Sequence, residues 1–293
     1  MPQEGTYLLT NVGFSPSEEP CITLQREGSF FDLLPLSKTI DLQFDNSQRY
    51  CVGWRNITTG ERSACPTAAA LDGKYEQCAA CQERTGFNPA FYHATSVSTQ
   101  QEARNQEPHI LYLARFGNGI IKVGISYAKR GRSRLLEQGA RDALILDTFP
   151  SANIARQYEA KIAALPNIVE TLQVRKKLSL ILQPYSHQDG EHELQATKQK
   201  IEEALKISFE KPQLFNLDPI YFPHDTPNLA DSVDCTDQNK LTGTVNGSVG
   251  SLLFCLYNET PVFLPLKKYV GYNVELAYTQ TQLSLPARQT SLF

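Results

Sequence analysis

The residue types best suited to chemistry gather in one short stretch of the chain, residues 109–140. Tyr112 and Lys122 come first, and a dense group of basic side chains follows them. Arginine forms planar, bidentate hydrogen bonds with phosphate, and lysine binds phosphate as a point charge. The stretch therefore predicts contacts with nucleic-acid phosphates. The residues expected to make these contacts are Arg115, Lys129, Arg130, Arg132 and Gln138.

Two strands and a helix are expected to position these side chains. Residues 110–113 are a short apolar run of β-favouring types, and 117–119 supply residues that tolerate the positive φ of a tight turn. Residues 120–125 continue as a second strand. Gly124 inside that strand indicates a close approach by another backbone or by a ligand. Helical spacing begins after the basic group, at residues 135–138.

This layout resembles the core of the GIY-YIG nuclease superfamily. Residues 110–112 match the first signature strand, and residues 122–124 match the second. The superfamily's arginine best matches Arg134, with Arg130 and Arg132 as other candidates. The resemblance implies a small antiparallel sheet with flanking helices.

Glu159, in the helical stretch 152–162, matches the metal-binding glutamate of the superfamily. The chain departs from the pattern at Ile110, where a glycine is typical, and at Lys122, where a tyrosine is typical. A lysine at that second position resembles a known branch of the superfamily. Gln138 stands where histidine or tyrosine is common.

The resemblance implies a catalytic role for four residues. Glu159 would hold one divalent cation, Mg²⁺ or Mn²⁺, which stabilises charge and lowers the pKa of bound water. Tyr112 would orient or deprotonate the attacking water. Arg134 would clamp the phosphate, and Lys122 would occupy the second tyrosine position. Each residue also has an ordinary interpretation, as a packed strand tyrosine, a solvated glutamate or part of a solvated basic loop.

Four of the seven cysteines are close together in the sequence and have metal-ligand character. Cys78 and Cys81 form a CxxC pair, whose two thiolates can face one tetrahedral ion. Cys51 and Cys65 could complete the set, which would then hold structural Zn²⁺ with no open catalytic position. A redox CxxC pair and isolated buried cysteines remain alternatives. His93 and His109 are possible replacement ligands.

The order of the motifs also resembles one uncharacterised bacterial family, a domain of unknown function. The likeness covers most of residues 40–280 and includes the cysteine set, the EQGA motif at 137–140, and residues 243–254 and 264–272. These motifs identify relatives without implying an activity.

The C-terminal stretch carries a separate motif. Gln289, Leu292 and Phe293 resemble the pentapeptide that binds the bacterial sliding clamp, in which glutamine is followed by two tolerant positions and Leu-Phe. Two apolar anchors in an otherwise polar segment suit insertion into a pocket with an extended backbone. The alternative is that Leu-Phe docks on this protein's own surface.

Composition limits the classes of protein that the chain can belong to. A formal net charge of -3 provides no global basic field, so nucleic-acid contacts must come from local patches. A hydrophobic content of 41% is typical of a globular protein. We see neither a secretory signal nor an apolar run long enough for a membrane span, so a cytoplasmic location and no membrane partner are expected.

The expected fold class is α+β, with a GIY-YIG-like core, a cysteine zinc module and β-rich terminal segments. The predicted divisions are a β-rich segment (1–50), the zinc module (51–105), the α/β core (106–210), an irregular connection (211–240), a second β-rich segment (241–280) and a flexible tail (281–293). The two β-rich segments are expected to pack together around the core.

Two functions follow from these observations. The first is a metal-dependent endonuclease or repair factor that hydrolyses nucleic acid, with DNA as the expected substrate, and is tethered to the sliding clamp. The second is a non-catalytic nucleic-acid-binding adaptor that keeps the scaffold and the zinc site. A redox or zinc-regulatory protein centred on Cys78 and Cys81 is a weaker third interpretation.

Overall fold

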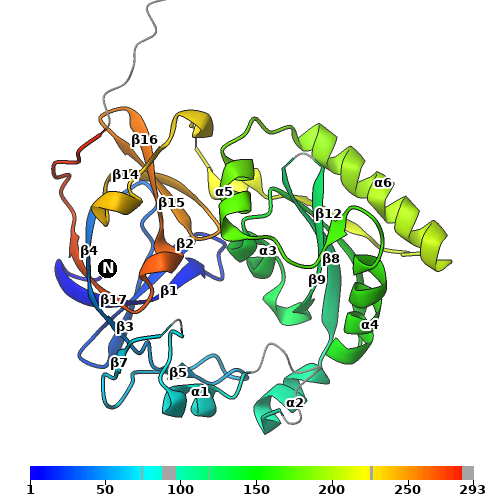
Figure 1. Cartoon of the computed structure of the whole chain (residues 1–293), viewed down its shortest axis with the longest axis horizontal. Helices are drawn as coiled ribbons and strands as arrows, with labels where there is room; N and C mark the ends of the chain where they lie inside the picture. The colour runs from blue at the N-terminus through cyan, green and yellow to red at the C-terminus, as the bar shows by residue number, and fades with distance from the viewer. Residues whose placement is uncertain (74, 88–96, 118, 225–226, 286–293) are drawn as a thin grey trace, which may run out of the picture.

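The chain folds into two β-containing lobes with a small cysteine-rich module beside them, as the computed structural model shows (Figure 1). The structure describes residues 1–73, 75–87, 97–117, 119–224 and 227–285. The predicted α+β class is confirmed. Within the described residues, no helix has the length and apolar character required to cross a membrane.

The first lobe is a ten-stranded sheet built from both ends of the chain. Its strand order is β13-β16-β15-β14-β4-β17-β1-β2-β3, and β7 pairs with β4. Strand β4 lies between β14 and β17, so the two β-rich segments form one sheet, as expected from the sequence. The strands are β1 (Gly5–Phe14), β2 (Pro20–Arg26), β3 (Ser29–Leu33), β4 (Thr39–Tyr50), β7 (Ala70–Leu71), β13 (Val233–Asp234), β14 (Lys240–Val249), β15 (Leu252–Tyr257), β16 (Thr260–Pro265) and β17 (Tyr272–Ala277).

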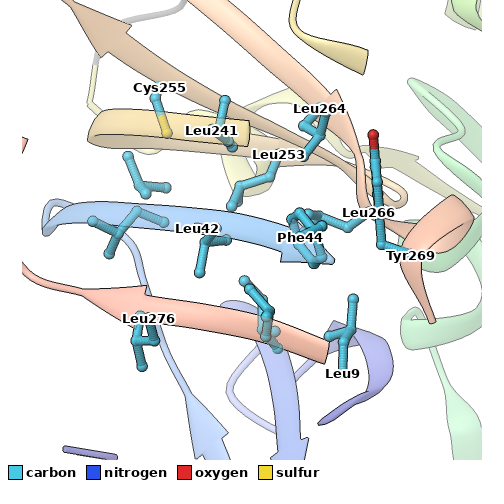
Figure 2. Close-up of a cluster of buried hydrophobic side chains, with 14 of the residues drawn as sticks. Leu9, Leu42, Phe44, Leu241, Leu253, Cys255, Leu264, Leu266, Tyr269 and Leu276 are labelled. Carbon is cyan, nitrogen blue, oxygen red and sulfur yellow. The ribbon is translucent and has the colours of Figure 1, made fainter. Parts of the chain in front are cut away.

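The strands of this sheet contribute the side chains of one hydrophobic core (Figure 2). Leu9, Leu42, Leu264 and Leu276, from four different strands, are almost fully buried in one cluster. The ring of Phe44 stacks on that of Tyr269 with 4.3 Å between centroids. Each such side chain stabilises the fold by about 1.5–3 kcal/mol on burial.

The second lobe is a five-stranded sheet in the order β11-β9-β8-β10-β12. Every residue of β8 is buried, because both faces of the sheet are covered. Helices α4 and α6 cover one face, where Ile162, Leu194 and Ile201 are packed. The strands are β8 (His109–Gly117), β9 (Ile120–Tyr127), β10 (Asp142–Phe149), β11 (Ile168–Val169) and β12 (Gln213–Asn216), and the helices are α3 (Ser133–Gln138), α4 (Ala152–Ala163), α5 (Val174–Ile181), α6 (His187–Leu205) and α7 (Asp218–Tyr221).

The other face of this sheet packs against α3, α5 and the first lobe. Tyr112 and Leu135 lie in one buried cluster with Val249, Phe254 and Phe263 of the first lobe. The two lobes therefore share a core, and their relative position is fixed by packing.

The cysteine module occupies the lower edge of the molecule in Figure 1. Its elements are β5 (Trp54–Arg55), β6 (Arg62–Ser63), α1 (Ala79–Thr85) and α2 (Thr99–Asn105). Strands β5 and β6 form a separate two-stranded hairpin. The remaining short elements of the chain are the 3₁₀ turns η1 (Ala128–Arg130), η2 (Leu229–Asp231), η3 (Thr236–Gln238) and η4 (Leu266–Tyr269).

Residues 211–240, predicted to be an irregular connection, contribute to both sheets. Strand β12 pairs with β10 at the edge of the smaller sheet, and β13 pairs with β16 at the edge of the larger one. The prediction was wrong because strands of four and two residues are too short to show a period-2 pattern. Their backbone groups are paired by long neighbouring strands.

Candidate functional site

Tyr112 lies at the centre of the second lobe, opposite Gly124 of the neighbouring strand. It is almost fully buried, and the side-chain amide of Gln138 donates a hydrogen bond to its hydroxyl group. A Cβ atom at position 124 would lie 2.5 Å from that hydroxyl oxygen. The close approach that the sequence indicated at Gly124 is therefore made by the Tyr112 side chain. Burial, followed in importance by the opposing effect of Arg134, raises the pKa of Tyr112, which stays neutral at pH 7.

Lys122 lies on β9, which packs against α4, the helix that carries Glu159. Its ammonium group donates a hydrogen bond of 3.0 Å to the carbonyl of Val123. Burial lowers the pKa of Lys122, and the nearby Glu159 carboxylate acts in the opposite direction. Lys122 and Glu159 therefore lie within electrostatic reach of each other.

Glu159 itself is only 6% exposed, although it sits on a helix. Its carboxylate forms an ion pair with Arg156 of the same helix. The same Arg156 Nη1 atom lies 3.4 Å from Oε1 of Glu170. Two carboxylates thus converge on one guanidinium group, and a divalent cation would compete with that group for Glu159.

Arg134 enters this group of side chains from α3. Its positive charge lowers the pKa values of Tyr112, Lys122 and Lys177, which places its guanidinium among them. Among the described residues, no carboxylate forms an ion pair with Arg134. The half-buried Arg134 side chain also acts on the Tyr112 hydroxyl through a hydrogen bond.

Lys177 of α5 is a further member of the group, to which the sequence alone assigned no role. Its ammonium donates a hydrogen bond of 3.0 Å to the carbonyl of Gln138 and lies 4.7 Å from the centroid of the Phe116 ring. Burial, and then the charges of Lys122 and Arg134, lower its pKa to about 8. The sequence spacing did hold a signal for this position. Lys177 precedes Leu180 by three residues and Ile181 by four, so it shares the helix face that these two residues bury.

We call this group the basic cluster, and its members are Tyr112, Lys122, Arg134, Gln138, Glu159 and Lys177. It combines three cationic side chains with one hydroxyl and one carboxylate in a largely buried setting. Such a setting strengthens interactions with an anion, because less water screens the charges. The four residues to which the sequence assigned catalytic roles are thus neighbours in the structure, contributed by four different elements.

Arg115 does not belong to this cluster, and its predicted contact with nucleic acid is wrong. Its side chain is completely buried, with Nε 2.8 Å from Oε2 of Glu193 and Nη1 3.5 Å from Oδ2 of Asp142. A guanidinium held by two carboxylates inside the protein cannot reach a phosphate.

Gln138 belongs to the basic cluster, and the three remaining predicted nucleic-acid contacts lie nearer the surface and form ion pairs. Lys129 Nζ is 3.3 Å from Glu107, Arg130 pairs with Glu137, and Arg132 Nη2 is 2.7 Å from Glu18. These pairs reduce the local excess of positive charge. Contact of these three side chains with nucleic acid stays a prediction.

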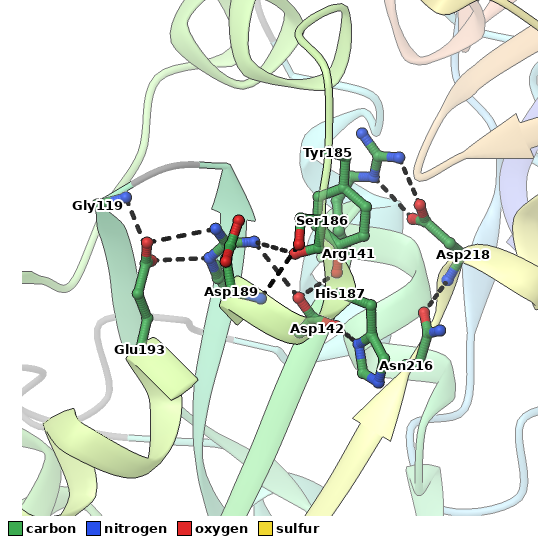
Figure 3. Close-up of polar contacts among 11 residues, drawn as sticks. Gly119, Arg141, Asp142, Tyr185, Ser186, His187, Asp189, Glu193, Asn216 and Asp218 are labelled. Carbon is green, nitrogen blue, oxygen red and sulfur yellow. Dashed lines mark hydrogen bonds and ion pairs between the residues drawn. The ribbon is translucent and has the colours of Figure 1, made fainter. Parts of the chain in front are cut away.

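A second polar network, around Asp142, was not foreseen from the sequence (Figure 3). Tyr185 donates a hydrogen bond to the fully buried Asp142 carboxylate, and Nδ1 of His187 lies 2.5 Å from its other oxygen. Arg141 beside it pairs with Asp218. The network joins residues more than 40 positions apart, and no local pattern announces such contacts.

The four predicted cysteine ligands meet in the cysteine module. The sulfur atoms of Cys51, Cys65, Cys78 and Cys81 all lie within 4.8 Å of one another. Two Zn–S bonds of about 2.3 Å in a tetrahedron separate their sulfur atoms by about 3.8 Å. Four thiolates at this spacing fit one Zn²⁺ ion and leave no position for a substrate, which is the geometry of a structural site.

Local backbone geometry brings these sulfur atoms together. The Cys78 N–H donates a hydrogen bond of 3.2 Å to the Cys51 sulfur. Gly53 has φ of +83°, and a Cβ atom there would lie 2.1 Å from the carbonyl oxygen of Ser63. Only glycine allows the two chain segments that carry Cys51 and Cys65 to approach so closely.

The structure describes one of the two alternative histidine ligands, and neither the other histidine nor the terminal motif. His109 is buried at the start of β8 with its Nδ1 2.8 Å from the Glu107 carbonyl, and it is not part of the cysteine group. His93 lies outside the described residues. The clamp-binding motif at Gln289, Leu292 and Phe293 also lies outside them.

Comparison with known proteins gives one match. The model of a family described as a protein of unknown function (DUF2797) matches residues 37–274. No curated protein and no solved structure matches the chain significantly. The matched region runs from just before β4 into β17 and includes the cysteine module and the basic cluster. Because the match spans most of both lobes, the chain belongs to the DUF2797 family.

Proposed function

We propose that this protein is a metal-dependent endonuclease or repair factor that hydrolyses phosphodiester bonds in nucleic acid, with DNA as the expected substrate. The observation that carries the proposal is the convergence of Tyr112, Lys122, Arg134 and Glu159 from β8, β9, α3 and α4. Phosphodiester hydrolysis requires cations on the phosphate and an oriented water molecule, and this group offers both.

The surrounding fold supports the resemblance to the GIY-YIG superfamily. Strand β8 lies between β9 and β10 with antiparallel pairing on both sides. Helix α3 connects β9 to β10, and α4 follows β10 with Glu159. A small antiparallel sheet with flanking helices is the core that the resemblance implies.

In this proposal, Arg134 and Lys122 bind the scissile phosphate. Arg134 contributes bidentate hydrogen bonds, and Lys122 contributes a point charge in a poorly solvated position. Tyr112 orients the attacking water through its hydroxyl group, because its raised pKa keeps that group protonated. Gln138 fixes the orientation of that hydroxyl.

Glu159 is the residue that would hold Mg²⁺ or Mn²⁺. A bound divalent cation would supply charge stabilisation and lower the pKa of water. A buried carboxylate suits such an ion. Arg156 pairs with Glu159 and with Glu170, so it must be displaced from Glu159 when metal binds.

The test is incubation of the protein with a panel of DNA and RNA structures and Mg²⁺ or Mn²⁺. Glu159→Gln and Arg134→Gln should each reduce cleavage by about 100-fold or more, the effect of losing a preorganised charge at a reacting phosphate. Glu203→Gln and Arg84→Gln, both at exposed positions, are matched controls that should keep full activity. Equal cleavage by the controls and the two cluster variants would refute the assigned roles.

A non-catalytic nucleic-acid-binding adaptor is the second candidate function. The Arg156–Glu159 ion pair favours it, because a glutamate paired with arginine is stable without a metal. Lys122 in place of tyrosine also favours it. The adaptor would bind nucleic acid with an affinity that falls as salt rises, and it would form no product with any metal.

We also propose that Gln289, Leu292 and Phe293 tether the protein to the bacterial sliding clamp. The sequence motif supports this partner. Binding of the full-length protein to purified clamp should be lost in the double variant Leu292→Ala/Phe293→Ala and kept in Thr290→Ala. Undiminished binding of the double variant would contradict the tether.

A further inference from the structure

A pocket of about 310 Å³ lies between the cysteine module and the first lobe, apart from the basic cluster. Its lining residues come from β1, β3 and η4 of the first lobe and from β5, β6 and α1 of the cysteine module. The volume is at the low end of the range for small-molecule sites, which begins at about 300 Å³. The pocket therefore has room for one small ligand or one unit of a polymer.

Aromatic side chains form part of the wall. Phe30 and Trp54 are half-buried, and Phe87 is 51% exposed. The exposed ring of Phe87 offers a flat surface for stacking. Nucleic-acid bases stack on such surfaces regardless of their sequence.

Positive charge dominates the same wall. Arg62 is held 3.0 Å from Asp32, and Lys267 is held 2.7 Å from Glu76. Arg55 forms no ion pair with any carboxylate in the described part of the chain. The pocket therefore presents one unmatched guanidinium, and the ligand that matches it is anionic.

Fixed amide groups complete the lining. The amide nitrogen of Gln77 donates hydrogen bonds of 2.8 Å to the Gly53 carbonyl and 2.9 Å to Thr85 Oγ1. The amide nitrogen of Gln82 donates one of 2.7 Å to the Gln77 carbonyl. Gln77 uses both of its N–H groups and Gln82 uses one, and the two side-chain oxygens remain as acceptors, the groups that recognise the amino groups of bases.

A band of arginines connects the pocket with the basic loop before α3. Arg55 is exposed at its outer side, and its pKa is lowered first by partial desolvation and then by the charge of Arg130, while the carboxylates of Glu137 and Glu76 act in the opposite direction. The pKa of Arg104 is lowered by burial and then by Arg130 and Arg55. The charges of these three guanidinium groups therefore act on one another, and Glu137, which pairs with Arg130, offsets part of that repulsion. A polyanion lying along them would relieve that repulsion.

We propose that this pocket binds one unpaired nucleotide of a nucleic acid, with its base on the aromatic wall and its phosphate at Arg55. The strand would then follow Arg104 and Arg130 toward the second lobe. The proposal rests on the proposed function in taking nucleic acid as the ligand, but it does not require cleavage.

Trp54 is the only tryptophan of the chain and lines this pocket, so intrinsic tryptophan fluorescence reports on the pocket as long as the metal content of the cysteine group is unchanged. The experiment titrates the full-length protein, without Mg²⁺ or Mn²⁺, with a single-stranded DNA tetranucleotide, a nucleoside 5′-monophosphate and ribose 5-phosphate. We expect saturable quenching by the tetranucleotide, weaker quenching by the monophosphate and none by ribose 5-phosphate, which has no base.

Variants assign the effect to the pocket. Arg55→Gln should weaken tetranucleotide binding about tenfold. The slope of log affinity against log salt concentration should fall by about the value of one phosphate contact. Phe87→Ser should weaken binding without disturbing the core, because the ring is half exposed. Arg84→Gln, on the exposed side of α1, is the control and should bind like wild type. Circular dichroism and zinc content would verify that each variant is folded.

The outcomes separate this proposal from the proposed function. If quenching depends on Arg55 but the protein cleaves no substrate, the nucleotide-binding pocket is supported and the nuclease activity is refuted. If the protein cleaves nucleic acid but shows no quenching, and Arg55→Gln binds like wild type, the pocket proposal is overturned and the nuclease proposal stands. Binding of the monophosphate but not of the tetranucleotide also overturns the proposal, because the ligand would then be a free nucleotide.

Discussion

The hydroxyl group of Tyr112 occupies the space that a side chain at position 124 would need. The two residues are partners in β8 and β9, and a Cβ atom added to Gly124 would lie 2.5 Å from the hydroxyl oxygen and 2.6 Å from Cζ. Glycine at position 124 is therefore required by Tyr112, and it sets where the phenol lies in the basic cluster.

We predict that Gly124→Ala lowers the free energy of unfolding by about 1–3 kcal/mol, the usual cost of overpacking a core. Denaturant unfolding would measure the change. Gly73→Ala is the control, since nothing lies within 4 Å of a Cβ atom there. If Tyr112 is the cause, the alanine should cost much less in a Tyr112→Leu background, because the two substitutions share one space. Additive effects would contradict this relationship.

The hairpin and helix around Tyr112 were predictable because their signals are local. An apolar β-favouring run, a turn rich in glycine and a helical repeat follow one another within residues 109–140, and each sets its own element. The cysteine ligands were predictable for a similar reason. The CxxC spacing of Cys78 and Cys81 is itself a geometric property of a metal site.

Partners from distant parts of the chain were not predictable. Lys177 reaches the basic cluster only because α5 packs across β8. The residue pattern of the strand does not indicate which helix will pack against it. Arg115 was misjudged for the same reason. It sits in a strand covered on both faces, so its position in the alternation does not place it at the surface. Its partner Glu193 lies on a helix 78 residues later.

The cysteine group should hold one Zn²⁺ ion per chain, measured by elemental analysis of the purified protein. Cys78→Ser should lose that ion and unfold residues of the cysteine module, because a structural zinc site contributes its binding energy to folding. Cys235→Ala is the matched control. Its sulfur is buried in the first lobe, away from the cysteine group, and the variant should keep the metal.

Chelation offers a second measurement at the same site. Trp54 follows Cys51 by three residues, so removal of zinc should shift its fluorescence toward that of a solvent-exposed indole. Retention of zinc by Cys78→Ser, or a Trp54 spectrum indifferent to chelation, would contradict four-cysteine coordination.

Lys177 should make nucleic-acid binding dependent on pH above neutrality. Its pKa is lowered from 10.5 to about 8, chiefly by burial. A phosphate beside the ammonium group would raise that pKa again, so binding takes up a proton. Affinity should therefore be greatest below pH 8 and should fall as pH rises through 8, since the free protein has lost the charge that the complex requires.

The measurement is a binding titration at a series of pH values with a DNA ligand and no divalent metal. The Lys177→Gln variant should bind more weakly than wild type at pH 7, and its affinity should not fall as the pH rises through 8. Lys176→Gln, at an exposed position of the same helix, should behave like wild type. An unchanged pH profile in Lys177→Gln would exclude this lysine from the binding site.

Gly190 lies in the first turns of α6, and we expect its replacement by alanine to destabilise the protein, contrary to the usual effect in a helix. Replacing an interior helix glycine by alanine usually stabilises a protein by about 1 kcal/mol. Here a Cβ atom would lie 1.9 Å from Oδ2 of Asp142 and 3.0 Å from Nη1 of Arg115. The alanine would push apart a buried carboxylate and guanidinium that are both completely inaccessible to water.

We therefore predict that Gly190→Ala lowers the free energy of unfolding by about 3–5 kcal/mol, the cost of breaking a buried ion pair. Gln199→Ala, on the exposed side of the same helix, measures the effect of alanine without the clash and should be close to neutral. Asp142→Asn should destabilise by a comparable amount, because it leaves Arg115 with one buried carboxylate fewer. A Gly190→Ala protein as stable as wild type would mean that α6 can move away from β10, and the network around Asp142 would then not fix the helix.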